Sequence, residues 1–207
     1  MNNIKIFSPA SVSNVCCGFD VLGFSIKGLG DEIIIRKSNS KGVKIKLVSG
    51  YKIPIDGKKN TACVAAQSLL DHLNVDLGFD IKINKNIKPG SGIGSSAASA
   101  VGAVYGINKI LGNPLKKEQL LKFAMQGEFI SSKTAPADNV ASALYGGLIL
   151  VNNRENYKVI KLPAPEDLLA VVHHPLIEIK TSKSRSVLPK TIDINLASQH
   201  LMNLLSQ

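Results

Sequence analysis

Apolar and polar residues alternate in several short segments of the chain, which is the pattern of half-buried strands. The clearest segment is Phe79–Ile83, and Ile4–Phe7 near the N-terminus is similar. Two further apolar runs, Ile33–Arg36 and Val43–Val48, flank the turn-forming residues Asn39–Gly42. Turn residues between two strand-like runs predict a β-hairpin at this place.

Apolar residues recur at helical spacing in three longer segments in the middle of the chain. The first begins after Asn60, whose side chain can cap it, and runs to about His72. The second follows Ser95 and stops at Gly112-Asn113-Pro114, a typical helix terminator. The third covers Lys116 to about Ser131. The apolar faces of the first and third helices are expected to carry Val64, Ala65, Leu69 and Leu70, and Leu120, Leu121, Phe123, Ala124 and Phe129.

The remaining segments give weaker but usable signals. The small polar residues that begin at Ser8 predict a loop after the first strand. Leu148–Val151 and Leu168–Val172 are expected to be strands, the second of them buried, with Pro163–Pro165 between them as a linker. Asn195–Leu205 has the apolar spacing of a further helix.

Composition narrows the class of protein. The chain has 207 residues, of which 44% are hydrophobic, enough for one substantial core. No apolar run approaches the ~20 residues that span a bilayer, so no membrane partner and a cytoplasmic location are expected. The three cysteines, Cys16, Cys17 and Cys63, predict reduced thiols because they form neither a disulfide framework nor a metal-ligand spacing.

The formal net charge of +10 would permit a nucleic-acid partner. However, the lysines are dispersed along the chain, and only 5% of the residues are aromatic. Attraction of an anionic small molecule and general solubility explain the charge equally well. No nucleic-acid partner is therefore expected.

The most informative segment joins the strand at Phe79–Ile83 to the second helix. Its residues are Pro89, Gly90, Ser91, Gly92, Ile93, Gly94, Ser95, Ser96, Ala97 and Ala98. Three glycines at alternate positions let the backbone approach a ligand closely, and the free N–H groups of a helix start favour an anion such as phosphate. An ordinary turn with a serine cap is the alternative interpretation.

Two common phosphate loops are excluded by the residues at the helix start. A Walker A loop needs a lysine directly before the Ser or Thr, but Gly94 is followed by Ser95. The dinucleotide fingerprint would place a third glycine at the position of Ser95. The segment from Pro89 to Ala97, which reads Pro-x-x-Gly-Ile-Gly-Ser-Ser-Ala, instead resembles the central ATP loop of the GHMP kinases.

Two other segments resemble the homoserine kinase family within the GHMP kinases. The first is the motif Ser-Asn-x-x-x-Gly-Phe-Asp-x-Leu-Gly, which runs from Ser13 through Asn14 and Asp20 to Gly23. The second is His-x-Asp-Asn-Val-x-x-Ala-x-x-Gly-Gly, matched from Asp138 and Asn139 to Gly147. The chain departs from the family pattern at Cys16-Cys17 and at Pro136, which stands where relatives usually have His.

A fourth segment, Thr181–Pro189, resembles the family's Thr-x-x-x-Arg-x-Leu-Pro signature, with Val187 as an additional residue before Leu188. Thr181 and Arg185 are four residues apart, so on a helical turn they would face the same way. An arginine fork can bind an amino-acid carboxylate through two charge-assisted bonds. An ordinary surface arginine is the alternative from the residues alone.

The resemblance implies an α+β GHMP kinase fold with two domains. Residues 1–163 would form a ribosomal-protein-S5-like ATP-binding domain, and residues 164–207 the start of a ferredoxin-like domain in a chain truncated at its C-terminus. The implied reaction is ATP-dependent phosphorylation of the hydroxyl of L-homoserine in threonine biosynthesis. Another GHMP small-molecule kinase of the mevalonate or shikimate type, or a non-catalytic nucleotide- or RNA-binding S5-like module, is the alternative. Relatives are often homodimers.

The resemblance also assigns roles to individual residues. The loop from Pro89 to Ala98, with Asn60, would bind ATP, and Glu128 with Ser96 would hold Mg²⁺. Asn14, Asp20, Asp138, Thr181 and Arg185 would bind the substrate, and Asp138 and Asn139 complete the catalytic set. On spacing alone Glu128 would be an ordinary solvated helix residue, and Asn60 an ordinary helix cap. The sequence identifies no general base.

Overall fold

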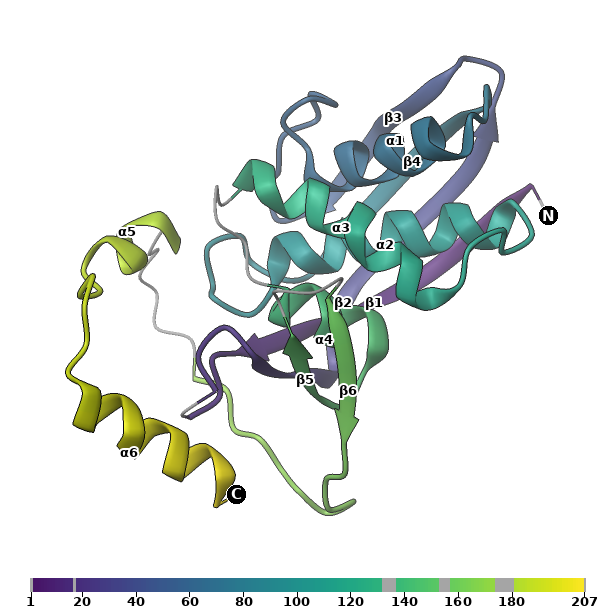
Figure 1. Ribbon diagram of the computed structural model, residues 1–207. Coiled ribbons are helices and arrows are strands. Elements are labelled where there is room, and N and C mark those ends of the chain that lie inside the picture. The colour runs from purple at the N-terminus through teal and green to yellow at the C-terminus, as the bar shows by residue number, and fades with distance from the viewer. Residues whose placement is uncertain (1, 17, 132–136, 153–156, 174–180, 207) are drawn as a thin grey trace.

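The computed structural model describes residues 2–16, 18–131, 137–152, 157–173 and 181–206. Its helices and strands alternate irregularly along the chain (Figure 1). They are β1 (Asn3–Ser13), β2 (Leu22–Ser38), β3 (Gly42–Gly50), α1 (Thr61–Leu73), β4 (Gly78–Lys85), α2 (Ser95–Ile110), α3 (Lys117–Ser131), α4 (Asp138–Tyr145), β5 (Leu148–Asn152), β6 (Lys158–Leu162), α5 (Thr181–Ser186) and α6 (Ile194–Leu205).

One six-stranded sheet organises the described chain. The hydrogen-bonded order is β3-β4-β2-β5-β6, and β1 pairs with the long strand β2 as well. Only β3 and β4 run parallel, whereas β1, β4 and β5 are antiparallel to β2 and β6 is antiparallel to β5. The length of β2 allows β5 to pair with its first residues and β4 with its last ones.

The core lies between this sheet and the helices α1, α2 and α3, which cover one face of it (Figure 1). The inward residues of β2 and β4, among them Ile33, Ile35, Phe79, Ile81 and Ile83, are fully buried. Small residues dominate α2, which is buried on almost every side. Because its side chains are small, α2 can lie deep between the sheet and the other helices. Its first turn follows the glycine-rich loop directly.

The helices agree well with the sequence pattern. α1 is capped by Asn60 as predicted, α2 ends at Leu111 before the Gly112–Pro114 stop, and α3 buries Leu120 and Leu121. Phe129, which is predicted on the apolar face of α3, is 60% exposed. Its spacing fits the helix, but the last turn of α3 extends past the core.

The expected hairpin between β2 and β3 is wrong. Strand β4 lies between them, antiparallel to β2 and parallel to β3. The residues 39–41 therefore connect two strands that do not pair with each other. The fully buried apolar face of β4 makes it the better central strand, and β3, with exposed Lys44 and Lys46, is left at the edge.

Two other expectations are wrong. Ser8–Ser13 is not a loop but the second half of β1, which pairs with β2 after an irregularity between Pro9 and Ser11. Leu168–Val172 is not a buried strand, since it has no strand partner among the described residues and Leu169 is 89% exposed. The strand β6 and the helix α4 are not predicted by the sequence pattern.

The segment after β6 lies apart from the sheet (Figure 1). Its described residues are almost all exposed, including apolar side chains of α6 such as Leu201 and Met202. The expected domain boundary at residue 163 and the ferredoxin-like nature of residues 164–207 stay predictions. No helix within the described ranges combines the length and hydrophobicity needed to cross a membrane.

Candidate active site

The glycine-rich loop lies between the end of β4 and the start of α2. Gly90, Gly92 and Gly94 all have positive φ angles, of 72°, 76° and 68°. Gly94 precedes α2, and no side chain caps the helix. The first helical hydrogen bond comes from the N–H of Ala98 to the carbonyl of Gly94, at 2.9 Å. The three N–H groups before it are therefore outside the helical ladder, as an anion site requires.

A second observation in this loop also favours a ligand. The hydroxyl of Ser91 is buried and has no hydrogen-bond partner among the described residues. A buried polar group without a partner is unfavourable unless something else binds it. Ala97 and Ala98, by contrast, are fully buried in the core beneath the loop, so any contribution to ATP binding would come from their backbone.

Strand β1 lies directly against the loop. The N–H of Ser11 donates to the carbonyl of Ile93 at 3.2 Å, and a Cβ atom at Gly94 would lie 2.0 Å from the Ser11 hydroxyl. Gly94 is thus required both by its φ angle and by this close approach. Ser11 is not predicted as a site residue from the sequence, because the residue pattern of this half of β1 is that of a loop.

Glu128 reaches the first turn of α2 from the neighbouring helix α3. The hydroxyl of Ser96 donates to Oε1 of Glu128 at 2.8 Å, and Glu128 is only partly exposed. Gly127 makes this approach possible, because its Cα packs against the start of α1, where a Cβ would lie 2.3 Å from the carbonyl oxygen of Thr61.

A hydroxyl and a carboxylate are the hard oxygen ligands that Mg²⁺ prefers, and this ion usually takes only one or two protein ligands beside phosphate and water. Ser96 and Glu128 therefore fit the predicted metal. Within the described ranges, no group of three or more His, Cys, Asp or Glu residues forms a metal cluster of its own.

Asp138, the first residue of α4, is fully buried at the other end of the site. One carboxylate oxygen accepts the N–H of Asn139 at 2.8 Å, and the other has no hydrogen-bond partner in the part of the chain that the structure describes. Burial is the main cause that raises the pKa of Asp138 to about 6, and the nearby charge of Asp20 acts in the same direction. The N–H of Asn139 and the charge of Arg185 act in the opposite direction.

The predicted substrate residues Asp20 and Arg185 meet although 165 positions separate them. Both guanidinium NH groups of Arg185 donate to the two carboxylate oxygens of Asp20, one of them at 3.0 Å. The guanidinium also lies 5.4 Å from the ring centre of Phe19. Asn14 supports the pair, because its side-chain oxygen accepts the N–H of Asp20 at 2.9 Å.

The loop that carries Asn14 and Asp20 has an unusual backbone. Asn14, Cys16 and Asp20 all have φ angles between 49° and 62°, in the left-handed region that non-glycine residues rarely adopt. Strain of this kind is concentrated at functional sites, where the surrounding structure maintains it. Cys16 is exposed and free; Cys17 lies outside the described residues.

Asn139 connects the two halves of the site. Its side-chain oxygen accepts the Ser11 hydroxyl at 2.8 Å, and its amide donates to the Ser13 hydroxyl at the same distance. It therefore joins α4, which carries Asp138, to the part of β1 that lies against the glycine-rich loop. The observed contacts of Asn139 hold other elements in place; a direct role in catalysis stays a prediction.

The remaining predicted residues are less clearly placed at the site. Asn60 is buried, and its side chain caps α1 through the N–H groups of Ala62 and Cys63 and donates to the carbonyl of Pro54. Its contact with ATP stays a prediction. The backbone of Thr181 begins α5, but its side chain lies outside the described part of the structure, as does Pro136.

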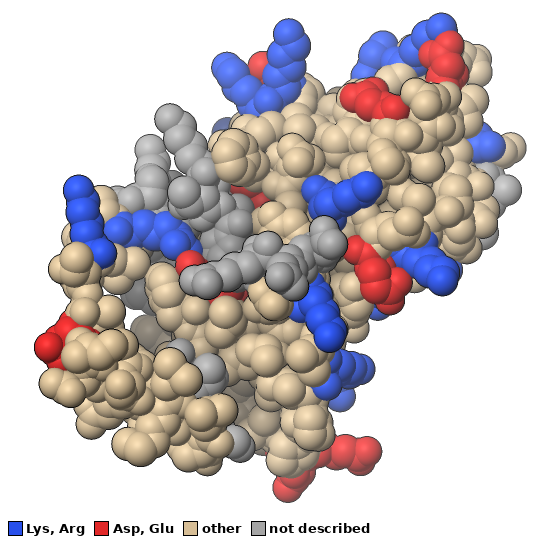
Figure 2. Space-filling view, viewed as in Figure 1, with Lys and Arg blue, Asp and Glu red and all other residues tan. Residues whose placement is uncertain are grey.

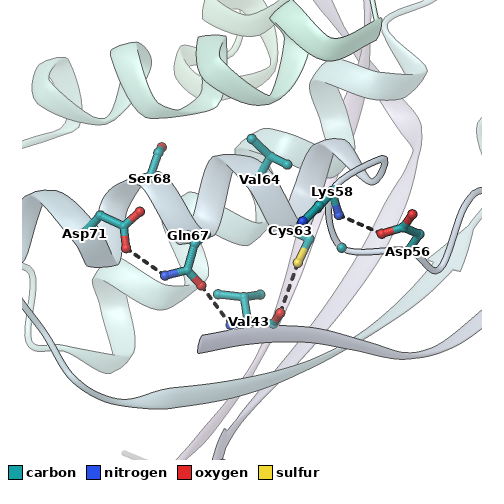
Figure 3. A pocket seen from close by; sticks show the side chains of 9 residues that line it. Val43, Asp56, Lys58, Cys63, Val64, Gln67, Ser68 and Asp71 are labelled. Carbon is teal, nitrogen blue, oxygen red and sulfur yellow. Dashed lines mark hydrogen bonds between the residues drawn. The ribbon is translucent and has the colours of Figure 1, made fainter. Parts of the chain in front are cut away.

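A surface hollow of about 400 Å³ lies between α1 and the edge strand β3 (Figure 3). Within it, the thiol of Cys63 donates to the carbonyl of Val43 at 3.1 Å, and the side-chain oxygen of Gln67 accepts the Val43 N–H at the same distance. Burial raises the pKa of the Cys63 thiol. The hollow includes none of the residues of the glycine-rich loop, so it is separate from that loop.

Comparison with known proteins identifies the fold and the family. The family model described as the GHMP kinases N-terminal domain matches residues 60–147, the region from the start of α1 to the glycines before β5. A mevalonate kinase from Methanococcus jannaschii shares the fold, with a TM-score of 0.61 at 20% identity, over 78% of this chain and 56% of that one. The fold is that of the GHMP kinases.

Proteins with higher sequence identity to this chain identify its family within the GHMP kinases. The chain is 40% identical to a homoserine kinase of Chlorobium phaeobacteroides and 37% identical to one of Chlorobaculum tepidum, over 99% of its own length and 68% and 67% of theirs. A crystal structure of homoserine kinase from Cytophaga hutchinsonii superposes with a TM-score of 0.90 at 42% identity, over 99% of this chain and 65% of that chain. The chain belongs to the homoserine kinase family and spans about two thirds of the length of these relatives.

Proposed function

We propose that the protein transfers the terminal phosphoryl group of ATP to the side-chain hydroxyl of L-homoserine, giving ADP and O-phospho-L-homoserine. The observation that carries this proposal is the meeting of Asp20 and Arg185 beside buried Asp138. Homoserine has an ammonium, a carboxylate and a hydroxyl. The carboxylate of Asp20 is complementary to the ammonium, and the guanidinium of Arg185 is complementary to the carboxylate.

On this proposal the substrate exchanges partners with the ion pair. Its carboxylate takes the guanidinium fork of Arg185, and its ammonium takes the carboxylate of Asp20, so that two charge-assisted contacts replace the one that is broken. Asn14 keeps Asp20 oriented, and Phe19 keeps the guanidinium over its ring. Thr181, at the start of α5, would support the carboxylate end.

The phosphate end is held by the glycine-rich loop. The N–H groups at the start of α2 and the Ser91 hydroxyl would bind the triphosphate of ATP, with Ser96 and Glu128 holding Mg²⁺. When bound, Mg²⁺ neutralises charge on the phosphates. Phosphoryl transfer depends mainly on positioning and charge, and Asn139 joins the two halves that must be positioned.

Replacing Arg185 by Ala tests the substrate end. Loss of a bidentate contact is worth about 2–3 kcal/mol, so the KM for homoserine should rise roughly 30- to 150-fold while the KM for ATP changes little. Arg36→Ala, an exposed arginine of β2, is the matched control. Kinetics should be measured with homoserine as acceptor and with mevalonate and shikimate as competing acceptors.

If the protein phosphorylates mevalonate or shikimate in preference to homoserine, it is a GHMP kinase with a different substrate. Salt-dependent binding of RNA without binding of Mg-ATP would instead favour a nucleic-acid module. On the face shown in Figure 2 the lysines and arginines stand singly or in small groups between uncharged residues, which gives no support to that alternative.

A further inference from the structure

A buried lysine lies beneath the glycine-rich loop and has no role in the proposed reaction. Lys85 ends β4, and its side chain is 2% exposed. Its ammonium donates to the carboxylate of Asp31 in β2, to the carbonyl of Ser95 at 2.6 Å and to the hydroxyl of Ser99 at 2.9 Å. All three donors of the ammonium are therefore used, two of them by the first turns of α2.

The same network also holds the other end of the loop. The second carboxylate oxygen of Asp31 accepts the N–H groups of Asn86 at 3.0 Å and Ile87 at 3.1 Å, the residues that enter the loop. The Ser95 hydroxyl donates to the carbonyl of Ile87 at 3.0 Å, which closes the base of the loop directly. Residues 88–94 are thus held at both ends by Lys85 and Asp31.

Stability is a weak reason for such a pair. Removing an ammonium and a carboxylate from water is unfavourable, and apolar replacements of buried pairs are often neutral or stabilising. Burial lowers the pKa of Lys85, whereas the charges of Asp31 and Glu128 act in the opposite direction. Glu128, which accepts the Ser96 hydroxyl at the start of α2, is thus one of the two carboxylates whose charge acts on the Lys85 ammonium.

We propose that Lys85 is a positioning residue for the triphosphate. It fixes the Ser95 carbonyl and the first turn of α2, so that the free N–H groups of this turn face the loop. It also places a positive charge beneath the loop. In a Walker A loop, by contrast, the lysine contacts the phosphate directly. This inference rests on the proposed function, since it requires that ATP binds here.

The test separates positioning from stability. Lys85→Met removes the charge and leaves Asp31 buried without it, so this single variant should be less stable than the wild type. The double variant Asp31→Asn with Lys85→Met removes both charges and should recover most of that loss. Its affinity for Mg-ATP should nevertheless be at least tenfold weaker, while its affinity for homoserine stays within twofold.

Thermal unfolding and calorimetric titration with Mg-ATP and with homoserine supply these measurements. Lys82→Met, three residues earlier on the same strand, is the matched control and should bind Mg-ATP as the wild type does. A stable double variant that binds Mg-ATP within twofold of the wild type would overturn the proposal. So would equal losses for ATP and homoserine, which indicate general damage.

A milder variant covers the case in which the double variant does not fold. Ser99→Ala removes one acceptor of the ammonium and leaves both charges in place. We expect about threefold weaker binding of Mg-ATP with unchanged binding of homoserine; no change would overturn the inference. Failure of the wild-type protein to bind Mg-ATP would instead remove the proposed function itself, so the two failures are distinguishable.

Discussion

Asp138 is fully buried, and burial makes ionisation of its carboxyl group unfavourable. Because the pKa of Asp138 is higher in the folded protein than in the unfolded chain, its contribution to stability is complete below about pH 4 and is lost as the pH rises through about 6. At neutral pH the residue is therefore ionised at the expense of stability. Such an arrangement is typical of a group that is kept for ligand binding.

Asp138→Asn should therefore stabilise the ligand-free protein at pH 8. The difference between about 6 and the ordinary 3.8 corresponds to at most about 3 kcal/mol, and we expect a gain of about 1–3 kcal/mol. The gain should vanish near pH 4, where both side chains are neutral. Denaturant unfolding of both proteins across this pH range measures it, and an equal difference at both ends would contradict the assignment.

The residues of the site differ in how far the sequence reveals them. Asp138, Asn139, Asp20 and Arg185 stand out through motifs, and the structure pairs Asp20 with Arg185 and buries Asp138 close to both. Ser11 and Lys85 do not stand out, because a buried serine in a strand and a lysine at a strand end are ordinary in sequence. Only the contacts between β1, β4 and α2 distinguish them.

At the scale of elements, helices are predicted more accurately than strand pairing. The periodicity of α1, α2 and α3 is local, and so are the signals at Asn60 and Gly112 that begin and end helices. Pairing depends on competition between strands far apart in sequence. β4 displaces the neighbouring β3 from β2 because its buried face is more apolar, and no local pattern reports that outcome.

The packing of α1 on α3 places Glu128 beside Ser96, the pair proposed to hold Mg²⁺. A side chain at Gly127 would meet the carbonyl of Thr61, so Gly127→Ala should push α3 outward and move Glu128 away from Ser96. Overpacking of this kind is destabilising by about 1–3 kcal/mol. We also expect the Mg²⁺ concentration needed for half-maximal transfer to rise several-fold.

Gln126→Ala provides the control, because this neighbouring residue is exposed on the same helix. Both variants should be compared by thermal unfolding and by activity across a Mg²⁺ titration. An unchanged Mg²⁺ requirement in a destabilised Gly127→Ala protein would separate the packing of the helices from the metal site and would contradict the role given to Glu128.

At the scale of the molecule, the first 163 residues contain both buried apolar clusters. The described residues beyond them contribute Arg185 to the site and otherwise remain largely exposed. On the proposed function, the phosphate and metal ends of the site would thus lie wholly in the first part of the chain, and the substrate end would join the two parts.

Residues 1–163 alone should therefore fold and keep the affinity for Mg-ATP within about threefold, but lose binding of homoserine. The physical reason is that the sheet, the core and the loop are complete without α5 and α6. Cooperative thermal unfolding and calorimetry with both ligands would measure this. A shortened chain that is unfolded, or that still binds homoserine, would refute the division.

The pairing of Cys63 and Gln67 with Val43 has a consequence for association between copies of the protein. β3 ends the sheet, and an open edge is where a foreign strand adds on and where fibrils begin. At Val43 both backbone groups are already occupied by side chains of α1. A strand arriving from another molecule would have to displace both side chains first, so strand addition at Val43 is disfavoured.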